Sequence, residues 1–165
     1  MNVRVGLGLD FHRLAQGRRL VLGGVEVPSR LGLEGHSDAD VLAHAVCDAL
    51  LGAARLGDVG RHFPPGDSAF KGISSMELLG RVRALLVESG FVPVQVDAVV
   101  VAERPRLAPH APSMEACMAE RLELPSEQVS VKATTSEGMG ALGREEGMAA
   151  WAVTLIQTSE ARPRK

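Results

Sequence analysis

Three side chains suited to holding a metal ion stand in two separate segments of the chain. Asp10 and His12 are two residues apart in an alternating stretch, so they point to the same side if that stretch is a strand. His44 lies in a later segment with helical spacing. One carboxylate and two imidazoles leave a fourth position open, as a catalytic zinc requires. A surface acid and two hydrogen-bonded histidines would give the same spacing, so the pattern alone leaves both interpretations open.

The residues just before His44 offer a support for its ring and a site for an anion. Asp40 precedes His44 by four residues; it could hold the second ring nitrogen or simply favour the start of a helix through its charge. Residues 35–38, Gly-His-Ser-Asp, stand where we expect that helix to begin. Backbone N–H groups there can bind phosphate, with His36 beside it. Plain capping of the helix by Ser37 is the alternative.

Two later segments also combine groups that bind phosphate. Residues 132–137 supply one lysine, three hydroxyls and one carboxylate; lysine and hydroxyls suit phosphate oxygens, and Glu137 could take a Mg²⁺ shared with phosphates. Residues 143–147 place Arg144 among acids and glycines, where it could fork onto phosphate. A polar turn and a surface ion pair are the alternatives. Together the segments predict a metal-dependent enzyme whose substrate carries phosphate.

The amino-acid composition indicates which kinds of partner the protein binds and in which cellular compartment it resides. The chain has 165 residues, a net charge of −2 and only 3% aromatic residues, which disfavours nucleic acid as the main partner. We find no signal-peptide pattern at the N-terminus and no apolar run near the ~18 residues of a membrane span. Cys47 and Cys117 fit reduced, buried cysteines better than a disulfide framework. These features predict a soluble, cytoplasmic protein with a core of Val, Leu, Ala and Met.

The periodic segments predict one α+β domain, a mixed sheet with helices packed on one face. We expect this domain over residues 1–158 and a flexible tail over 159–165. Alternation and β-branched residues indicate strands, with a Gly-Gly hairpin between the second and third, at 3–9, 20–22, 25–27, 95–102, 129–133 and 148–156. Helical spacing indicates helices that begin at Ser37–Asp40 and run to about 52, and that span 74–88 and 113–122. We expect loops at 32–35, 57–67 and 104–112.

Taken in order, the segments resemble the 2-C-methyl-D-erythritol 2,4-cyclodiphosphate synthase family. The resemblance runs from about residue 3 to residue 156, and each segment alone is a modest signal, whereas their joint order and spacing are specific. The segments that carry it are residues 6–12, 35–44, 48–53, 57–60, 70–72, 132–137 and 143–147.

This resemblance implies a reaction of non-mevalonate isoprenoid precursor biosynthesis. The substrate is 4-diphosphocytidyl-2-C-methyl-D-erythritol 2-phosphate, whose 2-phosphate attacks the β-phosphorus of the diphosphate. The cyclic diphosphate forms and CMP leaves, so the enzyme is a phosphorus–oxygen lyase. No water or protein nucleophile takes part, and catalysis is mainly positioning and charge neutralisation.

The resemblance also implies roles for individual residues. Asp10, His12 and His44 match the zinc ligands, and Glu137 matches the ligand of a second ion, Mg²⁺ or Mn²⁺. His36 and Thr135 match the positions that stabilise the transition state. The remaining matches contact the substrate, as do Asp10, His12 and Glu137. Ser37 and Arg144 match positions that contact the phosphates, and Asp58, Gly60 and Phe63 to Asp67 match positions that contact the erythritol. The positions on the nucleotide side are matched by Ala102 to Ala108 (with Arg106), Thr134 and Ser136.

Members of the family are homotrimers around a central cavity, which in some of them holds an isoprenoid diphosphate. Leu9, Arg144 and Glu146 match positions that line the cavity, and sequence does not decide whether Arg144 serves the cavity or the active site. Ala141 replaces an aromatic residue of some members, so we assign it no role.

Two other classes of function fit the same residues. A metal-dependent phosphohydrolase would need a general base, for which Asp48 or Asp58 is the candidate. A non-catalytic trimer would bind isoprenoid diphosphate in its cavity only.

Overall fold

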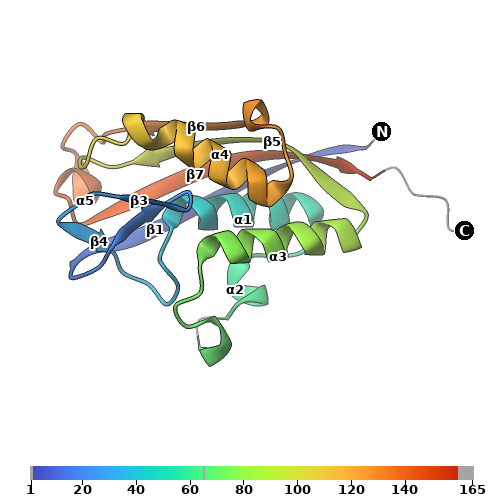
Figure 1. The fold of residues 1–165 in the computed structure, drawn as a ribbon, viewed down its shortest axis with the longest axis horizontal. Helices are drawn as coiled ribbons and strands as arrows, with labels where there is room; N and C mark the ends of the chain where they lie inside the picture. Colours follow the sequence, from blue (N-terminus) through green and yellow to red (C-terminus); the bar gives the residue numbers. More distant parts are fainter. Residues whose placement is uncertain (1, 65, 160–165) are drawn as a thin grey trace, which may run out of the picture.

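A five-stranded sheet in the order β4-β1-β7-β5-β6 is the framework of the computed structural model (Figure 1), which describes residues 2–64 and 66–159. All neighbouring strands are antiparallel except the parallel pair β5 and β6. A separate hairpin pairs β2 with β3. The strands are β1 (Val3–Gln16), β2 (Leu20–Leu22), β3 (Val25–Val27), β4 (Leu31–Leu33), β5 (Phe91–Val101), β6 (Val129–Thr134) and β7 (Gly147–Thr158).

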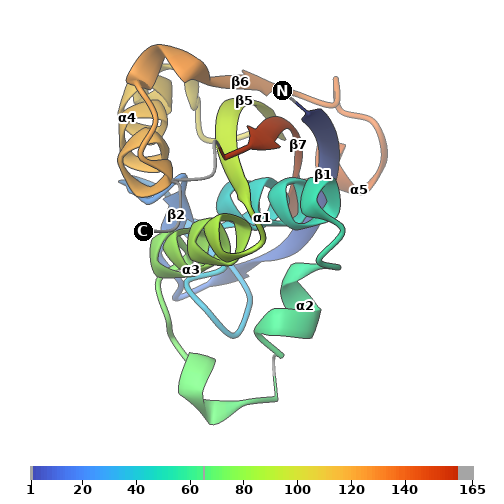
Figure 2. The same cartoon turned by 90° about the vertical axis from the view of Figure 1, so that its right-hand side faces the viewer.

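The long helices lie against the sheet and against one another. Figure 2 shows the sheet curling over α1, with α3 beneath that helix and α4 beside β6. The predicted α+β class, with a mixed sheet, is confirmed. The helices are α1 (Val41–Ala54), α2 (Val59–His62), α3 (Ser75–Glu88), α4 (Ala111–Leu122) and α5 (Gly140–Gly143), with short 3₁₀ turns at η1 (Ser68–Phe70), η2 (Ala108–His110) and η3 (Ser126–Gln128). No helix among the described residues is long and apolar enough to cross a membrane.

Two glycines let β1 lie directly on α1. A Cβ built on Gly6 would stand 1.8 Å from the carbonyl oxygen of Ala49, and one on Gly8 would stand 2.0 Å from that of Ala45. Any side chain there would clash with helix backbone. Since side chains alternate along a strand, the even-numbered face that carries these glycines also carries Asp10 and His12, and turns them toward α1.

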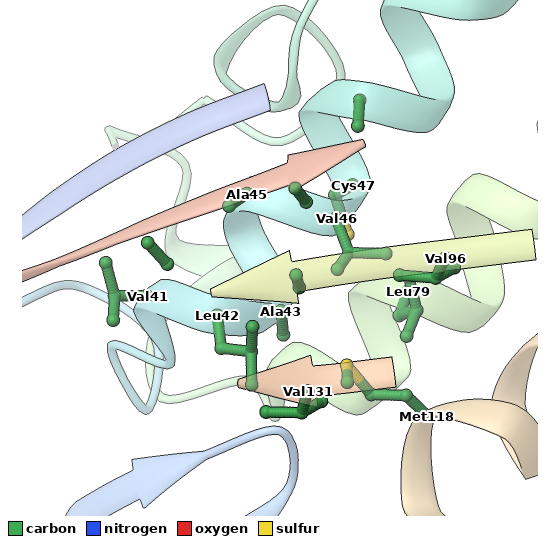
Figure 3. Packing of buried hydrophobic residues seen from close by; sticks show 14 of the residues in the cluster. Val41, Leu42, Ala43, Ala45, Val46, Cys47, Leu79, Val96, Met118 and Val131 are labelled. Atoms are coloured by element: carbon green, nitrogen blue, oxygen red, sulfur yellow. The ribbon is translucent and has the colours of Figure 1, made fainter. Parts of the chain in front are cut away.

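The core consists mainly of aliphatic side chains, as the composition predicted. Figure 3 shows Val41, Leu42, Val46 and Cys47 of α1 among residues of other elements, including Leu79 of α3, Val96 of β5, Met118 of α4 and Val131 of β6. Almost every side chain of α1 is buried, because sheet and helix α3 cover it on two sides. Burial at ~25 cal/mol per Å² of apolar area is the main stabilising term for such a helix.

The opposite face of β1 is apolar and uncovered in the single chain. Val5, Leu7 and Phe11 are 66%, 64% and 58% exposed, and Val153 on the adjacent β7 is 45% exposed. Their alternation with the buried Gly6 and Gly8 is the ordinary period of a strand. A row of exposed apolar side chains of this length is typical of an interface.

Several predicted boundaries are wrong. The first strand continues to Gln16, and part of the predicted loop 32–35 is β4, which pairs with it. The predicted loops 57–67 and 104–112 contain α2, η2 and the start of α4; helical segments this short leave no periodicity in a sequence. Cys117 is only partly buried, whereas Cys47 is buried. Of the predicted tail, residues 160–165 lie outside the described residues.

Candidate metal and phosphate site

Asp10, His12 and His44 converge on one point. The Oδ2 atom of Asp10 lies 2.9 Å from Nε2 of His12 and 3.0 Å from Nδ1 of His44, and the two ring nitrogens are 3.2 Å apart. Ligands at about 2.0–2.1 Å from a tetrahedral zinc are about 3.3 Å from one another. The three atoms therefore have the spacing of one face of a tetrahedral site, and the residues fit a metal ion.

The charges of the triad also suit a cation. Burial alone would raise the pKa of Asp10, but hydrogen bonds and charge from His12 and His44 outweigh it and lower the pKa to about 2. Burial alone would lower the pKa of His12, yet its contact with Asp10 raises it. The other nitrogen of His12, Nδ1, lies 2.6 Å from the carbonyl oxygen of Glu34. A ring N–H donated there leaves Nε2 free as a ligand.

Of the two roles left open for Asp40, the structure shows the one at the start of the helix, and the carboxylate does not hold the ring of His44. Its carboxylate is fully buried and accepts hydrogen bonds from the backbone N–H groups of Gly23 (2.9 Å), Gly24 (2.7 Å) and Ala43 (3.0 Å). Asp40 is the N-cap of α1, and its extended backbone turns the side chain toward the helix end rather than along the helix face. The predicted cap, Ser37, lies three residues too early.

The loop between β4 and α1 is held from two sides. Arg18 donates to the carbonyl oxygens of Leu33 (3.2 Å), Gly35 (2.9 Å) and, more weakly, Ser37 (3.5 Å). From the other side, Gly72 N–H donates to the carbonyl of His36 at 2.8 Å. His36 is exposed at this loop, while Ser37 is partly buried, with its hydroxyl 3.2 Å from Nε2 of His44. Arg18 was missed by sequence reasoning, since its target carbonyls carry no sequence signal.

Residues 134–137 form a second, exposed polar group at the end of β6. The Thr135 hydroxyl donates to Glu137 Oε1 at 3.1 Å, and Ser136 donates to Glu103 through its N–H (2.8 Å) and hydroxyl (2.9 Å). The Ser136 hydroxyl is the largest cause of the lowered pKa of Glu103. Lys132 pairs with Asp97, so the lysine predicted for phosphate is engaged elsewhere. Glu103, two residues beyond the end of β5, was missed.

The sheet keeps this group away from the triad within one chain. The registers align Asp10 with Ala150, Ala150 with Val100, and Val100 with Ala133. Three steps between strands amount to about 14 Å along the sheet. The structure thus brings together the predicted zinc ligands but does not bring Thr134, Thr135 or Glu137 to them.

The predicted nucleotide residues, except Ser136, line an open hollow of about 1290 Å³. Its lining includes Ala102, Arg106, Ala108, Thr134 and Thr135, together with Gln16 and Arg30 from the first part of the chain. The triad is not part of its lining.

The predicted erythritol residues gather around α2 instead. Asp58 caps α2 by accepting from Arg61 N–H at 2.9 Å, and Asp67 accepts from Ala69 N–H at 2.9 Å. Phe63 meets Phe70 edge to face at 5.4 Å, and Gly60 is exposed on α2.

Arg144 makes the ion pair that was the alternative to phosphate binding. Its Nε lies 2.7 Å from Glu146 Oε1, and both side chains are more than half exposed. Such a pair is weak in water, so an anionic ligand can still compete for the guanidinium.

Fold and triad together define an α+β protein with a metal-binding site, and comparison with known proteins agrees. The model of the YgbB family matches residues 3–157. The chain belongs to this family. It is 59% identical over 155 residues to 2-C-methyl-D-erythritol 2,4-cyclodiphosphate synthase of Syntrophomonas wolfei, covering 94% of this chain and 99% of that protein. The synthase of Gloeobacter violaceus is 58% identical over 155 residues, with 94% and 95% covered.

Solved structures of similar proteins share the fold. A structure of 2C-methyl-D-erythritol-2,4-cyclodiphosphate synthase in a CDP-bound form has a TM-score of 0.86 at 36% identity, covering 93% of this chain and 100% of that chain. The bifunctional IspDF protein of Campylobacter jejuni has a TM-score of 0.92 at 40% identity, covering 95% of this chain and 42% of that longer chain.

Proposed function

We propose that this chain converts 4-diphosphocytidyl-2-C-methyl-D-erythritol 2-phosphate to 2-C-methyl-D-erythritol 2,4-cyclodiphosphate and CMP. The observation that carries the proposal is the convergence of Asp10, His12 and His44, with their three ligand atoms 2.9–3.2 Å apart. Full-length relatives named as this synthase support it. The enzyme is a phosphorus–oxygen lyase of isoprenoid precursor synthesis, and we place it in the cytoplasm, where both free thiols stay reduced.

The main obstacle to this reaction is charge, because an anionic phosphate must approach an anionic diphosphate. An oxygen of the 2-phosphate forms a bond to the β-phosphorus, and the bond from that phosphorus to the CMP oxygen breaks. Asp10, His12 and His44 would hold zinc, and Glu137 would hold Mg²⁺ or Mn²⁺. When bound, such ions act as Lewis acids and as templates for phosphate oxygens. The protein then needs to position two groups of one molecule.

Hydrogen-bond donors beside the metal site serve the oxygens that gain charge. His36 is exposed on a loop fixed by Arg18 and Gly72, and the Ser37 hydroxyl lies beside His44. Thr135 of a neighbouring copy of the chain would supply a further hydroxyl. Donors held in place before the reaction stabilise the transition state without reorganisation. His36 and Thr135 are accordingly the catalytic residues of the proposal.

The remaining predicted residues would bind the two ends of the substrate. The hollow beside Ala102, Arg106 and Thr134 accommodates the cytidine, in keeping with a CDP-bound neighbour of the same fold. Asp58, Gly60, Phe63 and Asp67 would contact the erythritol, while Ser136 and Arg144 would contact the phosphates and nucleotide side.

A complete site requires a second copy of the chain. Thr135 and Glu137 are about 14 Å along the sheet from the triad, too far for one diphosphate to bind both groups in one chain. We propose a homotrimer in which the exposed row of Val5, Leu7, Leu9 and Phe11 packs around the central axis. Leu9, Arg144 and Glu146 would then line a central cavity able to take an isoprenoid diphosphate.

The phosphohydrolase has less support. Both candidate bases are engaged with backbone, since Asp48 accepts from Val59 N–H at 2.7 Å and Asp58 from Arg61 N–H at 2.9 Å. Each carboxylate therefore helps to fix α2.

One assay separates the three functions. The purified chain is incubated with the cytidyl substrate in ¹⁸O-labelled water, and products are followed by mass spectrometry and ³¹P NMR. We expect CMP and a cyclic diphosphate without ¹⁸O. Labelled phosphate would establish the hydrolase, and no turnover by the metal-loaded trimer would leave only the non-catalytic binder.

A further inference from the structure

The second ring nitrogen of His44 meets a buried hydroxyl that the proposed mechanism does not use. Nδ1 of His44 faces Asp10, and Nε2 lies 3.0 Å from Oγ of Ser75. Ser75 is the first residue of α3 and is fully buried. The second hydroxyl near Nε2, that of Ser37, is 3.2 Å away and only partly buried. Ser75 is thus the closer and more deeply buried partner.

The direction of each hydrogen bond follows from the number of protons. The Ser75 hydroxyl donates to Oδ1 of Asp38, and the Ser75 backbone N–H donates to Oδ2 of the same carboxylate at 3.0 Å. A hydroxyl has a single proton, so the oxygen of Ser75 can only accept from Nε2 of His44. A neutral imidazole carries one ring proton, which leaves Nδ1 with its lone pair.

The pair is held by elements on both sides of the ring. Asp38 N–H donates to the carbonyl of Ile73 at 3.2 Å, and α3 is anchored in the core by Leu79 and Val82. These hydrogen bonds join the loop before α1 to the start of α3 beside His44.

We infer that Asp38 and Ser75 are positioning residues that fix the tautomer and orientation of the metal ligand His44. The inference rests on the proposed function only in using the same metal site. Ser75, which is 31 residues from His44 in the chain, thus holds the ring of His44, a role that the sequence spacing suggested for Asp40. Outer partners of this kind commonly change metal affinity 10–100-fold when they are removed.

Two substitutions test the hydrogen-bond chain in different ways. Ser75→Ala removes the acceptor of the Nε2 proton. Asp38→Asn keeps the shape of the side chain but reverses the direction of the hydrogen bonds. When the amide oxygen accepts from Ser75 N–H, the amide nitrogen donates to the Ser75 hydroxyl oxygen. That hydroxyl must then donate to Nε2 of His44, which places the ring proton on Nδ1. The opposite amide orientation sets two N–H donors against each other. Ser74→Ala is the matched control, because Ser74 caps α3 through Met76 N–H at 3.3 Å and lies outside the His44 contacts.

The readouts are the zinc dissociation constant of the purified chain, from competition with a chelator, and the Nε2 proton of His44 in NMR spectra of ¹⁵N-histidine-labelled, zinc-loaded protein. We expect Ser75→Ala and Asp38→Asn each to weaken zinc binding about 10–100-fold. In Ser75→Ala the Nε2 proton should exchange rapidly with water. Ser74→Ala should lower the melting temperature and leave both readouts unchanged.

Unchanged zinc affinity in both variants, or equal losses in the Ser74→Ala control, would overturn the inference. If Ser75→Ala does not fold, the isosteric Asp38→Asn decides alone. Neither readout involves substrate. A wild-type chain that binds zinc with the predicted differences but forms no cyclic product would therefore refute the proposed function and leave this inference standing.

Discussion

The two polar groups of this protein differ in how complete they are within one chain. Asp10, His12 and His44 are partly buried, supported from behind, and already spaced for a metal ion. Residues 134–137 are mostly exposed, and their hydroxyl and carboxylate groups bond chiefly to one another and to Glu103. The difference supports the proposal that metal binding is a property of the single folded chain and that catalysis requires the proposed trimer.

The strongest way to break the first group is to remove a ligand. We expect His44→Ala to reduce turnover about 10³-fold or more, since a metal supplies several kcal/mol of charge stabilisation and 1.36 kcal/mol is tenfold in rate. Bound zinc, measured on the purified protein, should fall from about one per chain to none. His12→Ala should behave alike, and His110→Ala, on η2, is the control. Undiminished zinc in both ligand variants would contradict the assignment.

Breaking the assembly should separate metal binding from catalysis. Leu7→Glu places a charge on the exposed apolar row, where three copies would meet in a trimer. We expect a monomer by light scattering, turnover lowered about 10²-fold or more through loss of the partner's donors, and zinc retained. Val87→Glu, at an exposed apolar position of α3, should leave the trimer intact. A fully active Leu7→Glu monomer would show that one chain holds the whole site.

Mixing chains sharpens the same comparison. Thr135→Ala alone should lower turnover about 10²–10³-fold, as loss of a transition-state donor does. When it is co-expressed in equal amount with His44→Ala, random pairing around a ring should restore about a quarter of the sites. Activity that stays at the level of the single variants in isolated mixed trimers would mean that the triad and Thr135 of one chain act together.

The smallest expected effect concerns the support of α2. Burial raises the pKa of Asp48 above its usual value, so the folded chain binds this proton more tightly than the unfolded chain. The stability that Asp48 contributes is present at pH values below its pKa in the unfolded chain, and it is lost as the pH rises through its pKa in the folded chain. Asp48→Asn keeps an acceptor for Val59 N–H and removes the charge. It should raise the melting temperature slightly more at pH 7 than at pH 4, unlike the exposed control Glu88→Gln; an equal shift at both pH values would contradict this.

Sequence reasoning succeeded where a signal is local and periodic. The i, i+2 pair Asp10 and His12 and the long helix of His44 follow from alternation and from helical spacing, whereas their meeting as metal ligands was implied only by the family resemblance. The Gly-Gly hairpin and the helix over 74–88 are confirmed for the same reason.

The failures share a different cause. Spacing left open whether Asp40 holds His44 or favours the start of the helix, because it does not reveal that a capping residue turns its side chain back to the helix end. Ser75, Glu103 and Arg18 act on groups far away in the chain, through contacts that only tertiary packing creates. The helix α2 and the strand β4 are too short to leave a periodic trace.

The close approach of β1 to α1 makes the spacing of the metal ligands depend on backbone packing as well as on the ligands themselves. His44 is carried by the helix and Asp10 by the strand, and the gap between the two backbones at Gly6 and Gly8 admits no methyl group. A single added carbon there would wedge the two halves of the triad apart without touching a charge, a donor or an acceptor. The distance between the coordinating atoms thus depends on the absence of a side chain at Gly8 and Gly6, two and four residues before Asp10.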